Sequence, residues 1–109
     1  MSKPNDLVQG TLNMLLLKAL ARGPMHGWAI ANRIRTQSSD VLQVQQGTLY
    51  PALHKLEQHG FIESKWAPSE TGRRAKFYSL TRKGRKHLEK ETKDWERLSS
   101  AITVMVRSA

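Results

Sequence analysis

Six polar side chains in the middle of the sequence have the chemistry to contact nucleic-acid bases and phosphates. Gln46, Tyr50 and His54 recur at four-residue steps, which places them on one face if the segment is an α-helix. A glutamine amide can form two hydrogen bonds with an adenine edge, a threonine hydroxyl can bond a base or a phosphate, and tyrosine and lysine can bond a phosphate. A solvated helix face would carry similar residues, so that alternative stays open. The six residues are Gln45, Gln46, Thr48, Tyr50, His54 and Lys55.

A second chemical group is a cluster of basic residues. Residues 73–90 carry eight Lys and Arg side chains and a single acid, in a chain of 109 residues with a formal net charge of +9. Arg73, Arg74 and Lys76 directly follow the turn-forming Gly72. Clustered cations are typical of surfaces that bind polyanions, either nucleic acid or an anionic membrane, but a solvated helix face is also often basic. Composition alone leaves these three alternatives open.

The remaining reactive residue types do not form the patterns that catalysis or metal binding requires. The four histidines, at positions 26, 54, 59 and 87, include no pair four residues apart, so no helix face presents two of them to a metal. Cysteine is absent, which excludes disulfides and thiolate metal sites. No serine lies in a nucleophile-elbow pattern, and there is no glycine-rich phosphate loop. We therefore expect neither an enzyme nor a metal or cofactor site.

Hydrophobic periodicity predicts the first elements that position these groups. Apolar side chains at three- and four-residue steps near the N-terminus indicate a helix that is capped by Asn5 or Asp6 and ends near Gly23. A second helix is expected over residues 26–36, with one apolar face toward the core. Residues 41–44 are expected to form a short extended segment.

The polar face described above is expected to belong to a third helix. Leu49, Leu53 and Leu56 have helical spacing and are expected in the core, which leaves the polar residues on the other side. Pro51 fits the first turn if this helix begins near Thr48, whereas an earlier start implies a small distortion.

Two further elements complete the chain. Between residues 61 and 80 the apolar period changes to two, with turn-forming residues 68–73 in the middle, which predicts a β-hairpin with a basic return strand. Thr81 is then expected to cap a long last helix.

The last helix carries a heptad-like apolar seam, in which Glu91 is a polar exception. A helix of this length cannot lie wholly on a core this small, so part of the seam is expected to meet a second copy of the chain. Folding back onto its own domain is the alternative. The seam residues are Leu88, Trp95, Leu98, Ile102 and Met105.

The order of these elements is that of a winged helix-turn-helix, a mainly α fold with a small β-hairpin and a long C-terminal dimerisation helix. Residues 1–80 are expected to form the DNA-binding domain and residues 81–109 the dimerisation helix. In this architecture the third helix enters the major groove, and the hairpin, called the wing, follows the backbone or the minor groove. Arg73, Arg74 and Lys76 are then expected on the wing, where they would bind phosphates.

Residues 46–57, 60–62 and 72–84 together resemble the PadR family of transcriptional regulators, and segments 10–12 and 25–30 also match the family pattern. The resemblance implies a prokaryotic, dimeric, DNA-binding repressor of the short-tailed type with a single C-terminal helix. It places Gln46, Thr48, Tyr50 and His54 near the DNA groove, Arg73, Arg74 and Lys76 on the wing, and dimerisation on the helix from Thr81.

Trp28 departs from the family pattern, which usually has tyrosine at this position, and we expect it to pack between the second helix and its neighbours. The resemblance also implies a small-molecule site, because some short-tailed relatives stack flat, apolar drugs on a tryptophan of the last helix. Trp95 occupies the matching place, and Trp66 on the wing strand is a second candidate. Both residues have packing alternatives, at the subunit interface for Trp95 and within the hairpin for Trp66.

These observations predict a cytoplasmic homodimer that represses transcription by binding a pseudo-palindromic operator in double-stranded DNA. One alternative is a sensor whose primary event is binding a planar, apolar small molecule; another is a non-specific architectural nucleic-acid binder. The sequence has neither an apolar run of about 20 residues nor a secretory leader, so no membrane partner is expected.

Overall fold

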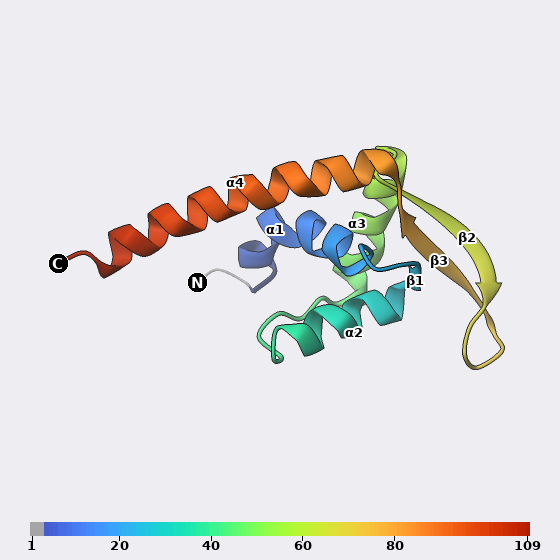
Figure 1. Ribbon diagram of the computed structural model, residues 1–109. Coiled ribbons are helices and arrows are strands. Elements are labelled where there is room, and N and C mark those ends of the chain that lie inside the picture. Colours follow the sequence, from blue (N-terminus) through green and yellow to red (C-terminus); the bar gives the residue numbers. More distant parts are fainter. Residues whose placement is uncertain (1–3) are drawn as a thin grey trace.

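The computed structural model describes the backbone of residues 4–109 and the side chains of residues 11–109 (Figure 1). The chain is mainly helical, with a small antiparallel sheet and one long C-terminal helix, as its sequence predicts. Asn5 and Asp6, the predicted caps of the first helix, lie outside the residues whose side chains are described. The elements are α1 (Pro4–Ala19), β1 (Met25–His26), α2 (Gly27–Gln37), α3 (Gln46–Gln58), β2 (Ile62–Pro68), β3 (Arg74–Leu80) and α4 (Arg82–Arg107).

The core lies where α1, α2 and α3 meet. Leu16 and Leu17 of α1 and Ile30 of α2 are fully buried in it. The predicted apolar stripe of α3 is confirmed, because Leu49 and Leu53 are buried in the same cluster. This burial fixes the rotation of α3 about its axis, so that its polar residues face solvent.

The sheet has three strands in the order β1-β3-β2, all antiparallel. The predicted hairpin is confirmed, with Ile62 opposite Leu80 and Pro68 opposite Arg74. The extended segment predicted at residues 41–44 is not a strand; the additional strand is β1, which pairs with β3 through Met25 opposite Tyr78. Residues 41–44 belong to no strand and form the connection into α3.

The helix α3 begins at Gln46, the earlier of the two starts that the sequence leaves open, and Pro51 lies inside the helix. A proline has no N–H, so the carbonyl of Gly47, four residues earlier, loses its helical partner. Both Gly47 and Pro51 are exposed, and water can bond that carbonyl instead.

The long helix α4 extends beyond the core (Figure 1). Thr81 caps it as predicted, with its hydroxyl oxygen accepting the N–H of Gly84 at 3.0 Å. The radius of gyration of 15.2 Å exceeds the ~13 Å expected for a compact chain of this length, and the extents of 56 × 29 × 21 Å express the same elongation. Among the helices of the described residues, none is both long enough and apolar enough to cross a membrane.

Candidate nucleic-acid interface

The exposed side of α3 carries most of the polar side chains that the sequence singles out. Because the leucine stripe faces the core, Gln46, Tyr50, His54 and Lys55 are exposed, and Gln45 is exposed just before the helix begins. Thr48 is half-buried. The structure thus brings hydrogen-bonding groups together on one accessible helix face.

Tyr50 is held at the junction of α3 and α2. Its ring lies against the first residue of α2, Gly27, where a Cβ would come within 2.7 Å of the Tyr50 hydroxyl. Glycine at this position allows the two helices to approach, and it leaves the tyrosine side chain 44% exposed at the molecular surface. The tyrosine is therefore positioned as well as accessible.

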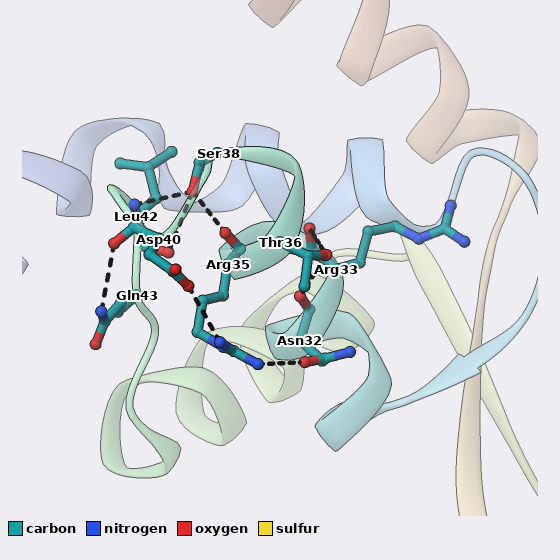
Figure 2. Close-up of polar contacts among 8 residues, drawn as sticks. All are labelled: Asn32, Arg33, Arg35, Thr36, Ser38, Asp40, Leu42 and Gln43. Carbon is teal, nitrogen blue, oxygen red and sulfur yellow. Dashed lines mark hydrogen bonds and ion pairs between the residues drawn. The ribbon is translucent and has the colours of Figure 1, made fainter.

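A polar network fixes the connection that leads into α3. The hydroxyl of Ser38 accepts the N–H of Leu42 at 2.9 Å, and Arg35 donates to Asn32 at 2.7 Å and to Asp40 at 3.1 Å (Figure 2). Asp40 has a positive φ of 67°, a left-handed conformation that aspartate tolerates better than most residues. This network links α2 to the turn that precedes α3.

The wing ends in a tight turn that presents two arginines. The N–H of Ser69 donates to the carbonyl of Arg73 at 2.7 Å, and Gly72 adopts a positive φ of 85°, as its predicted place in the turn requires. Arg73 and Arg74 are both exposed, and the Arg74 guanidinium lies 5.9 Å from the centre of the Trp66 ring. An aromatic face at this distance restricts the arginine by a cation–π contact.

Lys76, the third predicted wing cation, has a different environment from the two arginines. Its ammonium group lies 3.7 Å from a carboxylate oxygen of Glu57 at the end of α3, and that carboxylate also accepts a hydrogen bond from Ser64 on β2. Glu57 therefore ties α3 to both strands of the wing, and part of the Lys76 charge is compensated within the protein.

Tyr78 lies beside this network in the wall of the wing. Burial is the main reason that the pKa of Tyr78 is raised, and the negative charge of Glu57 and the nearby Tyr50 add to the effect. The phenol consequently stays neutral well above physiological pH, so it does not add negative charge beside the wing cations.

A groove of about 620 Å³ separates the wing from α3 and the start of α2. Its walls combine aromatic rings with cations, and Glu70 is the only acidic residue among the described residues that line it. This combination suits a sugar–phosphate strand, because cations pair with phosphates and flat rings pack on sugars and bases. The rings and cations are His26, Trp28, Tyr50, Trp66, Tyr78, Arg73, Arg74 and Lys76.

Two tryptophans and a leucine differ in burial from what the sequence predicts. Trp28 does not pack between helices as predicted; it is 64% exposed, because its place in the first turn of α2 points away from the core. Trp66 is also largely exposed rather than covered by the hairpin. Leu88, predicted on the dimerisation seam, is 8% exposed and belongs to the core of its own chain, where α4 runs beside α1.

The rest of the predicted seam is exposed in the part of the chain whose side chains are described. Trp95 is 45% exposed, and Leu98, Ile102 and Met105 are exposed at the following positions. A groove of about 160 Å³ runs between Trp95 and Leu98 of α4 and Met14 of α1. The seam thus divides into an inner end that is buried and an outer end that is bare.

Sequence reasoning missed several residues around this surface. Glu57 gave no signal, because its partners lie on strands whose placement depends on the tertiary structure. Trp28, Asn32 and Arg35 did give one, since steps of four and three residues place them on one face of a helix, opposite its apolar side.

Comparisons with known proteins agree with this geometry. The model of the transcriptional regulator PadR-like family matches residues 16–90. A transcriptional regulator from Clostridium thermocellum has a similar structure, with 28% identity and a TM-score of 0.84, covering 94% of this chain and 99% of that one. A PadR family transcriptional regulator from Eggerthella lenta has 27% identity and a TM-score of 0.80, covering 95% and 88%.

A protein of 37.1 kDa in transposon TN4556 of Streptomyces fradiae is 38% identical over 89 residues. The match covers 82% of this chain but only 24% of that protein, so the likeness concerns one part of a longer relative.

Proposed function

This chain belongs to the PadR-like family of transcriptional regulators, and on that premise we propose that it is a repressor that binds a pseudo-palindromic operator as a homodimer. The family comprises regulators rather than enzymes, and its membership implies DNA binding. In the proposed complex α3 enters the major groove and the wing follows the backbone or the minor groove. Repression follows if the operator overlaps a promoter, because the bound dimer blocks access to it.

The observation that carries this proposal is that neutral polar groups and cations occupy separate parts of one surface. The exposed face of α3 is mostly neutral and rich in hydrogen-bonding groups, whereas the exposed cations Arg73 and Arg74 lie beside it on the wing. Neutral amides and hydroxyls suit the reading of base edges, and arginines suit phosphates. A non-specific architectural binder contacts mainly phosphates, so it would not require neutral hydrogen-bonding groups on the exposed face of α3.

We propose that the bare outer end of α4 forms the dimer. Trp95, Leu98, Ile102 and Met105 follow steps of three, four and three residues, the spacing of a helix that packs against another helix. Residues 1–80 then form the DNA-binding domain and α4 the dimerisation element, with its first turns anchored in the domain core through Leu88. A two-fold axis would present two α3 helices to successive major grooves, about 34 Å apart.

The test is to recover duplexes from a random-sequence library with the wild-type protein and to measure binding as salt rises. The logarithm of the binding constant should fall with the logarithm of salt concentration, with a slope near −0.9 for each phosphate contact. Replacing both Arg73 and Arg74 with alanine should weaken binding to selected and random duplexes alike and flatten that slope. A library that yields no enriched sequence would contradict the operator.

The matched variant on α3 is Gln46→Ala, which removes an amide without changing charge. We expect it to keep the salt slope and to lose discrimination between selected and random duplex by about 1–3 kcal/mol, the worth of one bidentate base contact. If this variant retains the full preference of the wild type, Gln46 does not read a base.

A second candidate function, the binding of a planar apolar effector, is favoured by the groove beside Trp95. One chain supplies about 160 Å³ there, roughly half the volume of the smallest usual ligand pockets, so a second subunit would have to complete the site. Titration of the tryptophan fluorescence of the dimer with planar cationic dyes tests this. Quenching that survives Trp95→Phe would instead point to Trp28 or Trp66, the exposed tryptophans of the wing groove.

A further inference from the structure

One exposed face of α2 has no part in the function proposed so far. Trp28, Asn32 and Arg35 lie along it at steps of four and three residues, while Ile30 and Ile34 on the other side are buried in the core. Trp28 is the most exposed of the three tryptophans. A helix of a helix-turn-helix that keeps a cation, an amide and an aromatic ring on its outer face has the groups to contact a nucleic-acid backbone.

This face borders the start of α3 across a second groove, of about 230 Å³. The groove and the larger groove beside the wing share Trp28 and Tyr50, so the two surfaces are continuous. Among the described residues that line the smaller groove, none is acidic, and four carry side-chain amides that can donate hydrogen bonds. The four amides belong to Asn32, Gln43, Gln45 and Gln46.

Arg35 is the only cation in the lining of this groove within the described part of the chain, and its guanidinium is held in place. It donates to the Oδ1 atoms of Asn32 and Asp40, one on each side (Figure 2). These bonds use two of the five N–H groups of a guanidinium. The arginine and aspartate side chains are 47% and 67% exposed, so their mutual attraction is weak and a phosphate can compete for the arginine.

Arg33, two residues earlier on the same helix, has the opposite orientation. Its side chain runs away from Arg35 in Figure 2 and lines a different hollow, against Leu15 and Lys18 of α1. The two arginines share a helix and a charge but face different surroundings, and this makes Arg33 a matched control.

We propose that the outer face of α2 is a second DNA-backbone contact and that Arg35 binds a phosphate of the strand that borders the major groove occupied by α3. The proposal rests on the proposed function, since it needs α3 seated in DNA. The first helix of a helix-turn-helix crosses the DNA backbone, which brings the groove between α2 and α3 against a phosphodiester strand. Asn32 and Asp40 position the arginine in advance, and this lowers the entropy lost on binding.

The experiment compares Arg35→Gln with Arg33→Gln on two probes: a duplex recovered from the random library by the wild-type protein, and a random duplex of equal length. We expect Arg35→Gln to weaken binding to both by about tenfold, because a hydrogen bond to a charged group is lost. The salt slope should flatten by about 0.9 for each phosphate contact removed. Arg33→Gln should leave both quantities at the wild-type values.

Two further variants separate a phosphate contact from a purely structural role. Asp40→Asn removes the competing negative charge but keeps an Oδ1 that can accept from Arg35, so the cation stays positioned and should bind as tightly as in the wild type or more tightly. Arg35→Lys keeps the charge, so it should keep the wild-type salt slope even if Arg35→Gln proves unstable in thermal unfolding. The proposal is overturned if Arg35→Gln matches Arg33→Gln, if Asp40→Asn weakens binding as Arg35→Gln does, or if Arg35→Lys flattens the slope. A wild-type protein that binds neither probe would instead contradict the proposed function itself.

Discussion

Arg74 and Lys76 lie two residues apart on β3 and carry the same charge, yet they differ in how much of that charge is compensated within the protein. The guanidinium of Arg74 rests near an aromatic ring and remains exposed, so its charge is available to a partner. The ammonium group of Lys76 faces the carboxylate of Glu57, and this ion pair links Lys76 to α3. A count of wing cations therefore overstates the charge that the wing offers to phosphates.

The Glu57 network also leads to a prediction about Tyr78. Its raised pKa means that, above about pH 10, the unfolded chain loses this phenolic proton more readily than the folded chain does. The contribution of the protonated Tyr78 to the free energy of unfolding is therefore fully present below about pH 10 and is lost as pH rises through the folded pKa. We expect the free energy of unfolding to fall more steeply with pH in the wild type than in Tyr78→Phe, by at most about 1.4 kcal/mol per pH unit.

Urea unfolding at pH 8, 9, 10 and 11 measures this difference. Between pH 8 and 9 the stabilities of the two proteins should differ by a constant amount, and from pH 10 upward they should converge. Parallel curves over the whole range would show that the phenol of Tyr78 does not titrate differently on folding.

Among the elements, the wing and α4 are joined by several polar and aromatic contacts. Thr81 donates its N–H to the carbonyl of Phe61 at 3.1 Å and its hydroxyl to the carbonyl of Gly60 at 2.6 Å. Lys83 adds a bond to the carbonyl of His59 at 2.8 Å, and the His87 ring stacks on Phe61 with their centres 4.1 Å apart. These contacts fix the direction in which α4 leaves the domain.

Gly84 allows this close approach, although a glycine early in a helix looks unfavourable in the sequence. A Cβ at this position would overlap the backbone carbonyl of Phe61. We expect Gly84→Ala to lower the free energy of unfolding by at least about 2 kcal/mol, because backbone rather than a flexible side chain must move. Thermal unfolding followed by circular dichroism should show the loss.

The control is Gly47→Ala on the exposed side of α3, where a Cβ would meet no atom within 4 Å. Alanine should stabilise that helix by about 0.5–1 kcal/mol, since glycine is the poorer helix former. Equal and small effects of the two substitutions would contradict the packing argument at Gly84.

At the scale of the whole molecule, the protruding end of α4 dominates the shape. About a quarter of the 109 residues form this helix, and its outer end is exposed among the described residues. Four large apolar side chains follow one another on one side of that end, each 45–74% exposed, and a contiguous exposed apolar patch commonly marks a protein–protein contact. A second copy of the same helix has the matching pattern, and this is the physical basis of the proposed dimer.

We expect Trp95→Glu to convert the dimer into a single chain of 12.4 kDa in sedimentation experiments, because a carboxylate would be buried without a partner. Operator affinity should fall with it, since one chain contacts only one half-site. Val104→Glu is the matched control: Val104 is similarly exposed but lies on the other side of α4 from the seam, so the dimer should persist. A Trp95→Glu protein that sediments as a dimer would place the interface elsewhere.

Much of this protein follows from local sequence patterns. The leucine steps of α3, the period of two in the wing and the cap at Thr81 predict their elements because side-chain spacing, turn glycines and helix caps act within a few residues. The residues expected to read bases and bind phosphates follow from the same patterns, since the polar side of an amphipathic helix is fixed once its apolar side is buried.

Other features depended on which distant segments meet. Residues 25–26 form the third strand because they lie beside the edge of β3 that β2 leaves free. The segment 41–44, which the sequence predicts to be extended, does not join the sheet. Leu88 joined the core because α4 begins against the domain, whereas Trp95, seven residues on, lies at its margin and is 45% exposed. The contacts of Lys76 with Glu57 and of Arg35 with Asn32 and Asp40 likewise exist only once the chain is folded. Spacing determines which face a residue shares, but burial and ion pairing are set by what lies opposite that face, and this the tertiary structure alone decides.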